Sequence, residues 1–301
     1  MTQDAPTRSG FVALIGAPNA GKSTLVNQLV GSKVAIVTHK VQTTRALLRG
    51  IATHGRAQIV FVDTPGIFQP KRRLDRAMVT TAWGGAKDAD LVLAIVDAER
   101  GLKGDAEALL EKLADVRQPV VLVLNKVDRI KRETLLALAA DANARATFEA
   151  TFMVSALNGS GCGDLLDWLA QRLPEGPWYY PEDQISDLPM RQLAAEITRE
   201  KLYLRLHQEL PYSSTVETEK WEEKQNGSVR IEQVIYVERE SQKKIVLGAK
   251  GETIKAIGQA ARKEIGEILE QPVHLFLFVK VRENWSDDPE RYREMGLEFP
   301  S

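Results

Sequence analysis

One glycine-rich segment near the N-terminus constrains the fold of this chain more than any other. Residues Gly16–Ser23 follow the apolar run Phe11–Ile15 and precede a helix-like segment, Thr24–Val30. The two glycines allow the loop to curl so that successive N–H groups face a phosphate, and the helix N-terminus adds partial positive charge. In such a loop the lysine reaches the β- and γ-phosphates and the serine hydroxyl binds Mg2+. A plain glycine turn is the alternative, but the order strand, loop, helix favours a nucleotide site formed by Gly16, Ala17, Pro18, Asn19, Ala20, Gly21, Lys22, Ser23 and Thr24.

Composition excludes several other classes of protein. The chain has 301 residues, enough for two domains, and its net charge of −1 indicates no general attraction to nucleic acid or membrane. A single cysteine, Cys162, excludes an intramolecular disulfide and a cysteine-cage metal site, and we expect it to be a packed thiol. The N-terminus lacks a signal or transit pattern, and no apolar run is long enough to span a bilayer. We therefore expect a cytoplasmic protein that visits a membrane at most peripherally.

The first half of the chain alternates apolar runs with helix-period segments. The expected strands are Phe11–Ile15, Ala46–Thr53, Gln58–Asp63, Leu91–Asp97, Val120–Asn125 and Phe152–Ser155. The expected helices are Ser23–Val30, Leu74–Ala86, Asp105–Ala114, Arg132–Asn143 and Gly163–Leu173. This order predicts an α/β fold with a doubly wound, mostly parallel sheet. The second and third strands are too close for a helical crossover, which predicts an antiparallel hairpin at the sheet edge.

The second half has a different organisation. Residues Pro174–Pro189 contain four prolines and no sustained period, which indicates an interdomain linker, and we expect its Trp178-Tyr179-Tyr180 cluster to pack against one domain rather than stack on bases. Beyond it we expect a helix over Met190–Leu210, strands over Ser213–Lys224 and Val229–Glu238 joined by a turn at Asn226-Gly227, helices over Ser241–Leu247 and Glu252–Leu269, and a strand over Val273–Val281. We expect Met190, Leu193, Ile197 and Leu204 to share one face of the first helix. The order helix, strand, strand, helix, helix, strand predicts a smaller α+β domain.

Two further motifs stand at the ends of buried strands. Asp63-Thr64-Pro65-Gly66 is by itself a good turn, but after a phosphate loop Asp63 is suited to hold Mg2+ through water and the Gly66 N–H to contact a γ-phosphate. Asn125-Lys126-Val127-Asp128 indicates guanine, because the Asp128 carboxylate can accept hydrogen bonds from N1–H and the 2-amino group, whereas adenine would leave it buried and unpaired. Asn125 would tie loops together and the Lys126 stem would cover a ring face. Ser155-Ala156 would offer backbone N–H groups to the guanine O6.

A pair of threonines, Thr43 and Thr44, lies between the first helix and the edge strand, followed by Arg45. A threonine hydroxyl in such a loop binds Mg2+ only while the γ-phosphate is present, which makes the loop a switch. Both residues are candidates for this role, and we favour Thr44.

These motifs resemble the Era/TrmE branch of the translation-factor-related bacterial GTPases over roughly the first 173 residues. The resemblance implies GTP hydrolysis with Lys22, Thr44 and Gly66 at the reaction centre. Ile67 follows Gly66, where Ras-type enzymes have a glutamine that orients the attacking water, and the branch shares this hydrophobic replacement. In relatives an asparagine at the position of Asn19 helps to hold a K+ ion; a loop residue that satisfies its own backbone is the alternative.

A second loop, Gly248-Ala249-Lys250-Gly251, separates two of the predicted helices. A Gly-x-x-Gly loop allows a nucleic-acid backbone to approach closely, although a tight helix–helix turn would explain the tetrapeptide equally well. Residues 182–301 contain 18 Lys and Arg against 23 Asp and Glu, which argues against indiscriminate RNA binding. Residues 241–263, however, contain six basic residues and one acid, so the positive charge gathers at this loop. The RNA-binding candidates are Lys243, Lys244, Gly248, Ala249, Lys250, Gly251 and Lys255.

This loop and the element order resemble a type II KH domain, so the resemblance to the Era family extends over nearly the whole chain. It implies a monomeric GTPase that uses GTP, GDP and Mg2+, with K+ as a further candidate, binds small-subunit ribosomal RNA near its 3′ end, and assists assembly of the small ribosomal subunit. Some members of the family also associate peripherally with the cytoplasmic face of the inner membrane. The alternatives are a tRNA-modifying or membrane-regulatory GTPase of the same branch, and a P-loop kinase for a small substrate.

The expected domain boundaries follow from these assignments. They are a flexible N-terminus over residues 1–10, a GTPase domain over 11–173, the linker over 174–189, a type II KH domain over 190–284 and a weakly ordered C-terminal tail over 285–301.

Overall fold

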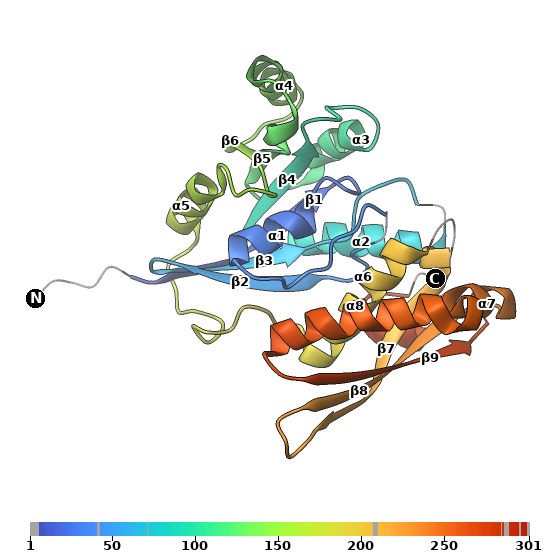
Figure 1. The fold of residues 1–301 in the computed structure, drawn as a ribbon. Helices are drawn as coiled ribbons and strands as arrows, with labels where there is room; N and C mark the ends of the chain where they lie inside the picture. Colours follow the sequence, from blue (N-terminus) through green and yellow to red (C-terminus); the bar gives the residue numbers. More distant parts are fainter. Residues whose placement is uncertain are drawn as a thin grey trace, which may run out of the picture. The chain divides into compact units, whose positions relative to one another are not determined.

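The structure, a computed structural model, describes residues 6–40, 43–70, 72–206, 210–283, 285, 289–294 and 296–299. These residues form two compact units. The first consists of described residues within 1–187 and 295–301, and the second of described residues within 188–294. The first unit is α/β and the second is α+β, as the sequence predicts (Figure 1).

The first unit is built around a six-stranded sheet with the order β2-β3-β1-β4-β5-β6. Its strands are β1 (Arg8–Gly16), β2 (Leu48–His54), β3 (Ala57–Asp63), β4 (Leu91–Asp97), β5 (Val120–Asn125) and β6 (Ala150–Val154). Its helices are α1 (Lys22–Val30), α2 (Arg73–Lys87), α3 (Asp105–Lys112), α4 (Arg132–Arg145) and α5 (Cys162–Arg172). All neighbouring strands pair in parallel except β2 and β3, which form the predicted antiparallel edge hairpin.

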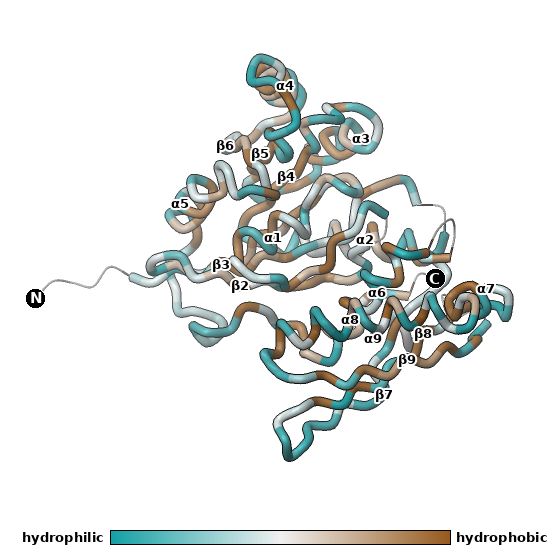
Figure 2. The backbone as a smooth tube through the Cα atoms, viewed as in Figure 1, coloured by the Kyte–Doolittle hydropathy of each residue, from teal (hydrophilic) through white to brown (hydrophobic). Residues whose placement is uncertain are grey.

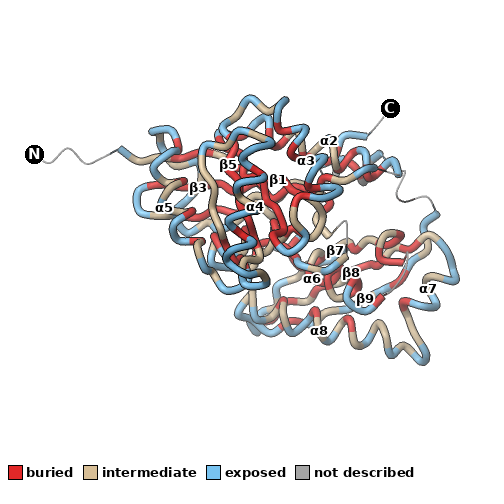
Figure 3. Tube along the Cα trace, turned by 90° about the horizontal axis from the view of Figure 1, so that it is seen from above, coloured by how far each residue is buried: buried red, intermediate tan, exposed pale blue. Residues whose placement is uncertain are grey.

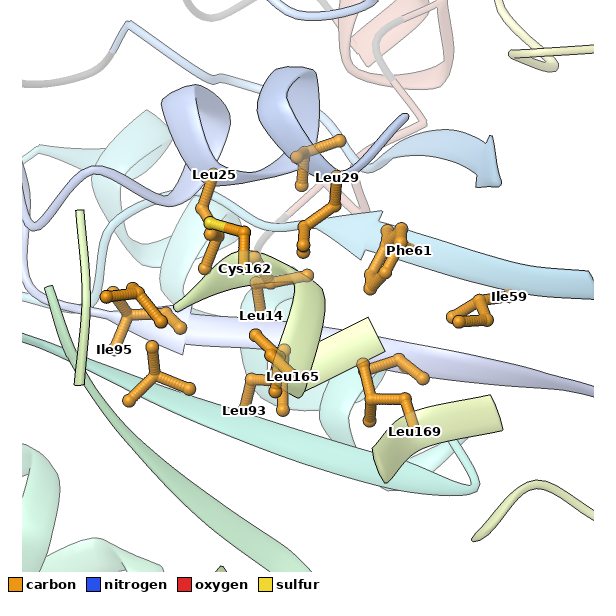
Figure 4. Close-up of a cluster of buried hydrophobic side chains, with 14 of the residues drawn as sticks. Leu14, Leu25, Leu29, Ile59, Phe61, Leu93, Ile95, Cys162, Leu165 and Leu169 are labelled. Carbon is orange, nitrogen blue, oxygen red and sulfur yellow. The ribbon is translucent and has the colours of Figure 1, made fainter. Parts of the chain in front are cut away.

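Helices cover both faces of this sheet, which explains why its strands are continuous apolar runs. On one face Leu25 of α1 and Leu165 of α5 pack with Leu14 and Leu93 from the sheet, as Figure 4 shows. On the other face α2, α3 and α4 cover the alternate side chains of β1, β4 and β5. Every residue of β4 and β5 is buried, and all but the last residue of each strand, Asp97 and Asn125, are apolar. Both strands are largely brown in Figure 2. Because parallel strands with both faces covered bury every side chain, hydrophobicity along them does not alternate.

The N-terminal strand starts earlier than the sequence predicts. Arg8, Ser9 and Gly10, assigned to a flexible N-terminus, pair with Ala57–Ile59 of β3 and belong to β1. The prediction was wrong there because Arg8-Ser9-Gly10 has no apolar pattern, and only the neighbouring strand holds it in the sheet. The remaining part of the predicted N-terminus that lies within residues 1–5 is outside the described residues.

The segment expected to be a linker is attached to the first unit over most of its length. Ser9 Oγ donates a hydrogen bond to Pro177 O at 2.7 Å, and the Gln58 side-chain amide bonds the backbone of Tyr179 and Tyr180 at 2.8–3.0 Å. The Tyr179 ring lies 5.0 Å from that of Phe11, which confirms that this aromatic cluster packs on a domain.

The end of the same segment pairs with β2. Ile51 N donates to Ile185 O at 2.9 Å, and Gly50 and Ser186 form an antiparallel bridge. The Arg49 guanidinium and backbone N–H both bond the Asp187 carboxylate, at 2.8 and 3.2 Å. The division between the two units falls directly after Asp187.

The second unit has a three-stranded sheet, β7-β8-β9, in which β7 and β8 are antiparallel and β8 and β9 are parallel. Its strands are β7 (Ser214–Glu223), β8 (Val229–Val237) and β9 (Val273–Val281). Its helices are α6 (Met190–Arg205), α7 (Glu240–Leu247), α8 (Glu252–Leu269) and the short α9 (Pro289–Glu294). Ile231 and Ile235 of β8 pack against α6 and α8 together with Ile257 and Ile265 of α8. Figure 3 shows the buried residues of this unit in red.

The second unit differs from the predicted one at the end of α6 and in the C-terminal tail. On α6, Met190 and Leu204 are 47% and 50% exposed, whereas Leu193 and Ile197 are buried together with Ala194, Leu202 and Tyr203. The helix ends at Arg205, and residues 207–209 of the predicted helix lie outside the described residues. The expected weakly ordered tail contributes the buried side chains Trp285 and Tyr292, and Trp285 Nε1 donates to Ser213 O at 3.1 Å.

Candidate functional site

The phosphate loop joins β1 to α1 with the backbone that the glycines allow. Gly21 has φ +94°, and a side chain at Gly16 would place a Cβ 2.5 Å from Ile95 O. Lys22 is buried, and its Nζ donates to the loop carbonyls of Gly16 and Ala17 at 3.1 Å each. Burial lowers the pKa of Lys22 to about 8, while the nearby Asp63 carboxylate opposes this shift. A buried cation beside a curled row of N–H groups is suited to bind an anion.

Three oxygen ligands gather beside the loop from three segments of the chain. Ser23 Oγ lies 2.6 Å from Asp63 Oδ2 and 2.9 Å from Thr44 Oγ1, and Thr44 Oγ1 lies 3.3 Å from Asp63 Oδ2. Burial raises the pKa of Asp63, and hydrogen bonds from Ser23 together with the charge of Lys22 oppose the rise. Asp63 Oδ1 is buried with no hydrogen-bond partner among the described residues. An unpartnered carboxylate oxygen beside two hydroxyls fits a hard divalent cation such as Mg2+.

The other threonine has a different role in the loop. Thr43 Oγ1 lies 2.6 Å from Thr38 Oγ1 and donates to Lys40 O at 2.7 Å, so it bonds within its own loop. Of the two candidates, Thr44 is the one whose hydroxyl meets Ser23 and Asp63.

The loop after β3 lies directly against the phosphate loop. A Cβ at Gly66 would lie 2.9 Å from the Pro18 ring, so only glycine fits this approach without a shift. Ile67 N donates to Gly16 O at 2.9 Å. The Ile67 side chain is 4% exposed and packs in the core, so it contributes no polar group to the site. Thr64 Oγ1 donates to Leu14 O at 2.6 Å, which attaches this loop to β1.

Asn125 connects the segments expected to bind the base. Its Nδ2 donates to Ala20 O at 2.9 Å, and its Oδ1 accepts from Lys126 N at 2.8 Å and from Ala156 N at 3.0 Å. Lys126 has φ +65°, and its Nζ donates to Asn19 O at 2.8 Å. The buried side-chain amide of Asn125 therefore holds the phosphate loop together with the two loops expected to bind the base, Asn125–Asp128 and Ser155-Ala156. Ser155 Oγ is buried and has no hydrogen-bond partner within the described part of the chain.

A pocket of about 380 Å3 joins these features. Of the predicted nucleotide residues, those that line it are Pro18, Asn19, Gly21, Lys22, Ser23, Thr24, Gly66, Asn125, Lys126, Asp128 and Ala156, together with Thr43 and Thr44. The other predicted nucleotide residues, Gly16, Ala17, Ala20, Asp63, Thr64, Pro65 and Ser155, are not among its lining residues. Further lining residues that the sequence motifs did not predict are Asp97, Glu99, Arg100, Arg129 and Leu157, together with the whole segment from Ile36 to Lys40. Asp97 could have been found, because it ends a buried parallel strand next to the one that ends at Asn125.

The predicted RNA loop lies between α7 and α8 in the second unit. Gly248 and Gly251 have φ +75° and +79°, and a Cβ at Gly248 would lie 2.2 Å from Thr253 Oγ1. Lys244, Lys250 and Lys255 are exposed and form no ion pair within the described residues, whereas Lys243 lies 4.0 Å from Glu240. The exposed Ile245, 58% accessible, adds an apolar side chain beside these charges.

Comparisons with known proteins place both units in known families. The family model for the 50S ribosome-binding GTPase matches residues 11–126, and that for the KH domain matches residues 209–286. Proteins named GTPase Era from Mesorhizobium japonicum, Rhizobium meliloti and Brucella suis are 82%, 79% and 78% identical, and each comparison covers at least 98% of this chain and 94% of the relative. The chain belongs to the Era family of GTPases.

Solved Era structures share the fold of this chain. One, Era in complex with MgGDPNP and nucleotides 1506–1542 of 16S ribosomal RNA, is 38% identical, with a TM-score of 0.90 over 96% of this chain and 99% of that one. An Aquifex aeolicus Era variant bound to GDP.AlF4- has a TM-score of 0.91 at the same identity and coverage. The resemblance to the Era/TrmE branch and to a KH domain is thereby confirmed.

Two remaining predictions concern isolated features of this Era-family chain. Cys162 is buried, and burial raises the pKa of its thiol to about 11, which fits a packed rather than a reactive thiol. No helix among the described residues is long and apolar enough to cross a membrane.

Proposed function

We propose that this protein is a GTP-binding and GTP-hydrolysing switch that binds small-subunit ribosomal RNA through its KH domain and assists assembly of the small ribosomal subunit. The observation that carries the proposal is the full-length match to Era, of which one solved structure holds both MgGDPNP and a 16S ribosomal RNA segment. This match favours the proposal over a tRNA-modifying or membrane-regulatory GTPase and over a small-molecule kinase.

Positively polarised groups bind the phosphate end of the nucleotide, and a carboxylate binds the guanine base at the other end. Lys22 and backbone N–H groups of the phosphate loop bind the phosphates, and Asp128 accepts hydrogen bonds from the two guanine donors. Asn125 keeps the base loops on the phosphate loop, as its three hydrogen bonds indicate. Ala156 lines the pocket, but the backbone N–H groups of Ser155 and Ala156 donate to Ser160 O and Asn125 Oδ1, at 2.9 and 3.0 Å, so neither is free to meet the guanine O6 as the sequence predicts.

Ser23, Thr44 and Asp63 would hold Mg2+, with Asp63 acting through water. The ion supplies positive charge to the phosphate oxygens. The buried Asp63 Oδ1, which has no hydrogen-bond partner in the described part of the chain, supports this assignment. Since Thr44 reaches this cluster from the loop before β2, loss of the γ-phosphate would release that loop and Gly66 together.

We expect slow intrinsic hydrolysis, because Ile67 is buried in the core and cannot orient a water molecule. Asn19 is the candidate for a K+ site. It lines the pocket, and its backbone has φ +63°. Its Nδ2 donates to His39 O at 2.9 Å, which connects the phosphate loop to the loop that contains Thr44.

The potassium role has a direct test in GTP turnover. Turnover of the wild type in K+ should exceed that in Na+, and Asn19→Ala should remove the difference. Asn143→Ala, an exposed asparagine on α4, is the control and should keep it. Equal wild-type rates in the two salts would refute the assignment.

The second unit binds RNA through the loop Gly248-Ala249-Lys250-Gly251 and the lysines Lys243, Lys244 and Lys255. The glycines admit the RNA backbone, and Lys244, Lys250 and Lys255, which form no ion pair with any other described residue, attract its phosphates. Reorientation of the two units about the chain after Asp187 would link this site to the nucleotide. The protein works in the cytoplasm as a monomer under this proposal, and peripheral membrane contact stays a prediction of the family resemblance.

Crosslinking in cells tests the RNA half of the proposal. The wild type should enrich small-subunit ribosomal RNA over other cellular RNA, with crosslinks at residues 243–255. Lys250→Glu should lose most of this enrichment, whereas Lys112→Glu on α3 should retain it. No enrichment of small-subunit ribosomal RNA by the wild type would overturn the proposal.

A further inference from the structure

Asp97 is a buried carboxylate in the wall of the nucleotide pocket that none of the four nucleotide motifs contains. It ends β4, and its register partner on β5 is Asn125. Asp97 is only 6% exposed, and its Oδ2 lies 2.5 Å from Lys126 Nζ. A buried carboxylate is unfavourable unless it is paired, so this ion pair accounts for its presence in the wall.

Lys126 is restrained at both ends of its side chain. At the backbone, its N–H donates to Asn125 Oδ1 at 2.8 Å and its φ is +65°. At the tip, its Nζ bonds Asp97 Oδ2 and Asn19 O, the latter at 2.8 Å. The four-carbon stem between these points has high rotamer entropy when it is free. With both ends fixed, the stem is held along the wall that also contains Asp128.

The two oxygens of Asp97 have separate partners. Oδ1 accepts hydrogen bonds from the backbone N–H groups of Glu99 and Arg100, at 3.0 and 3.4 Å. Oδ2 meets Lys126, and Arg100 Nε lies farther away at 3.7 Å. One oxygen therefore shapes the turn after β4 and the other holds the lysine, so the two roles can be separated by substitution.

We infer that Asp97 is a positioning residue for the guanine nucleotide: it fixes the Lys126 ammonium so that the lysine stem is already in place to cover the face of the base. This inference rests on the proposed nucleotide site. A stem that is ordered before binding loses less rotamer entropy when the base arrives, which raises affinity. The contact is with a ring face, so it adds affinity for any purine and leaves recognition of the 2-amino group to Asp128.

A double-mutant cycle on GDP affinity tests this coupling. Asp97→Asn keeps an oxygen for the turn but removes the charge that attracts Lys126, so it should weaken GDP binding about tenfold. Lys126→Met should weaken binding at least as much, and the double variant should be no weaker than Lys126→Met alone. Asp97→Glu, which restores the carboxylate, should recover part of the affinity. Asp141→Asn, an exposed aspartate paired with Arg145 on α4, is the matched control and should bind like the wild type.

Two further measurements separate this role from a structural one. The ratio of affinities for GDP and inosine diphosphate, which lacks the 2-amino group, should stay unchanged in Asp97→Asn. The thermal midpoint of each nucleotide-free variant checks that it is folded. Unchanged GDP affinity in a folded Asp97→Asn protein would overturn the inference. So would a tenfold loss that persists in the Lys126→Met background, since Asp97 would then act through the turn. Failure of the wild type to bind GDP would instead refute the proposed function.

Discussion

Nucleotide affinity should weaken as the pH rises above 8, because the lysine that meets the phosphates loses its proton in the free protein. Burial lowers the pKa of Lys22 to about 8. Bound phosphates stabilise the ammonium form, so binding above this pH requires uptake of a proton. With a free-site pKa of about 8, the apparent Kd for GDP should rise about tenfold between pH 7 and pH 9.

The same shift predicts the opposite trend for the stability of the nucleotide-free protein. The folded pKa of Lys22 is below its unfolded value of 10.5, so the buried charge disfavours folding at pH below 8. That cost, about 3 kcal/mol at most, fades as the pH rises from 8 toward 10.5. Lys22→Met removes the charge and should therefore be more stable than the wild type at pH 7, with the difference shrinking above pH 8.

Fluorescence titration with a labelled GDP across pH 7–9 measures the affinity, and calorimetry in two buffers at pH 8 measures the proton uptake, expected to be about half a proton. Lys22→Arg is the control, because a guanidinium stays charged throughout this range. Any titration of the nucleotide itself appears in both proteins. A wild-type affinity that stays constant between pH 7 and pH 9, or an equal slope in Lys22→Arg, would refute the reasoning.

Two other predictions follow from the base site and the core. Asp128→Asn should lower GDP affinity by at least about a hundredfold and raise affinity for xanthosine diphosphate, because an amide cannot accept both guanine donors; competition titrations with the two nucleotides check this, and unchanged preference for GDP would contradict it. Leu169→Ala, at a position with 0% exposure between α5 and the sheet, should cost about 3–5 kcal/mol of unfolding free energy in urea. An exposed control, Leu136→Ala on α4, should change the unfolding free energy far less.

The parts of the fold that the sequence predicts best are those in which local pattern and tertiary burial agree. The strands β4 and β5 are apolar up to their last residues because helices cover both faces, and their predicted and observed bounds coincide. The prediction for Arg8-Ser9-Gly10 was wrong because pairing with β3, and not a pattern in these residues themselves, makes them part of a strand. In α6 the apolar residues Met190 and Leu204 satisfy a helical period, yet both are about half exposed, since period alone does not say where the neighbouring sheet lies.

The candidate site likewise contains residues that the sequence predicts and one that it does not. Gly16, Lys22, Asp63 and Asn125 belong to motifs whose spacing encodes the chemistry, so sequence suffices to find them. Asp97 is different, because its role depends on the direction of the Lys126 side chain. The number of residues between Asp97 and Lys126 does not predict that direction. Its position at the end of β4 was available as a signal, but a strand-end aspartate becomes informative only with a partner beside it.

The pairing of residues 185–187 with β2 has a consequence for the solubility of shortened forms of this protein. β2 is an edge strand, and the backbone groups of Arg49 and Ile51 that face outward bond Ile185, Ser186 and Asp187. An edge strand without such a cover presents free N–H and C=O groups that recruit strands from other molecules. A chain ending after residue 187 keeps the cover and should stay monodisperse. A chain ending after residue 173 exposes the edge and should self-associate through β2. Residues 174–187 of the first unit therefore also protect that unit against aggregation.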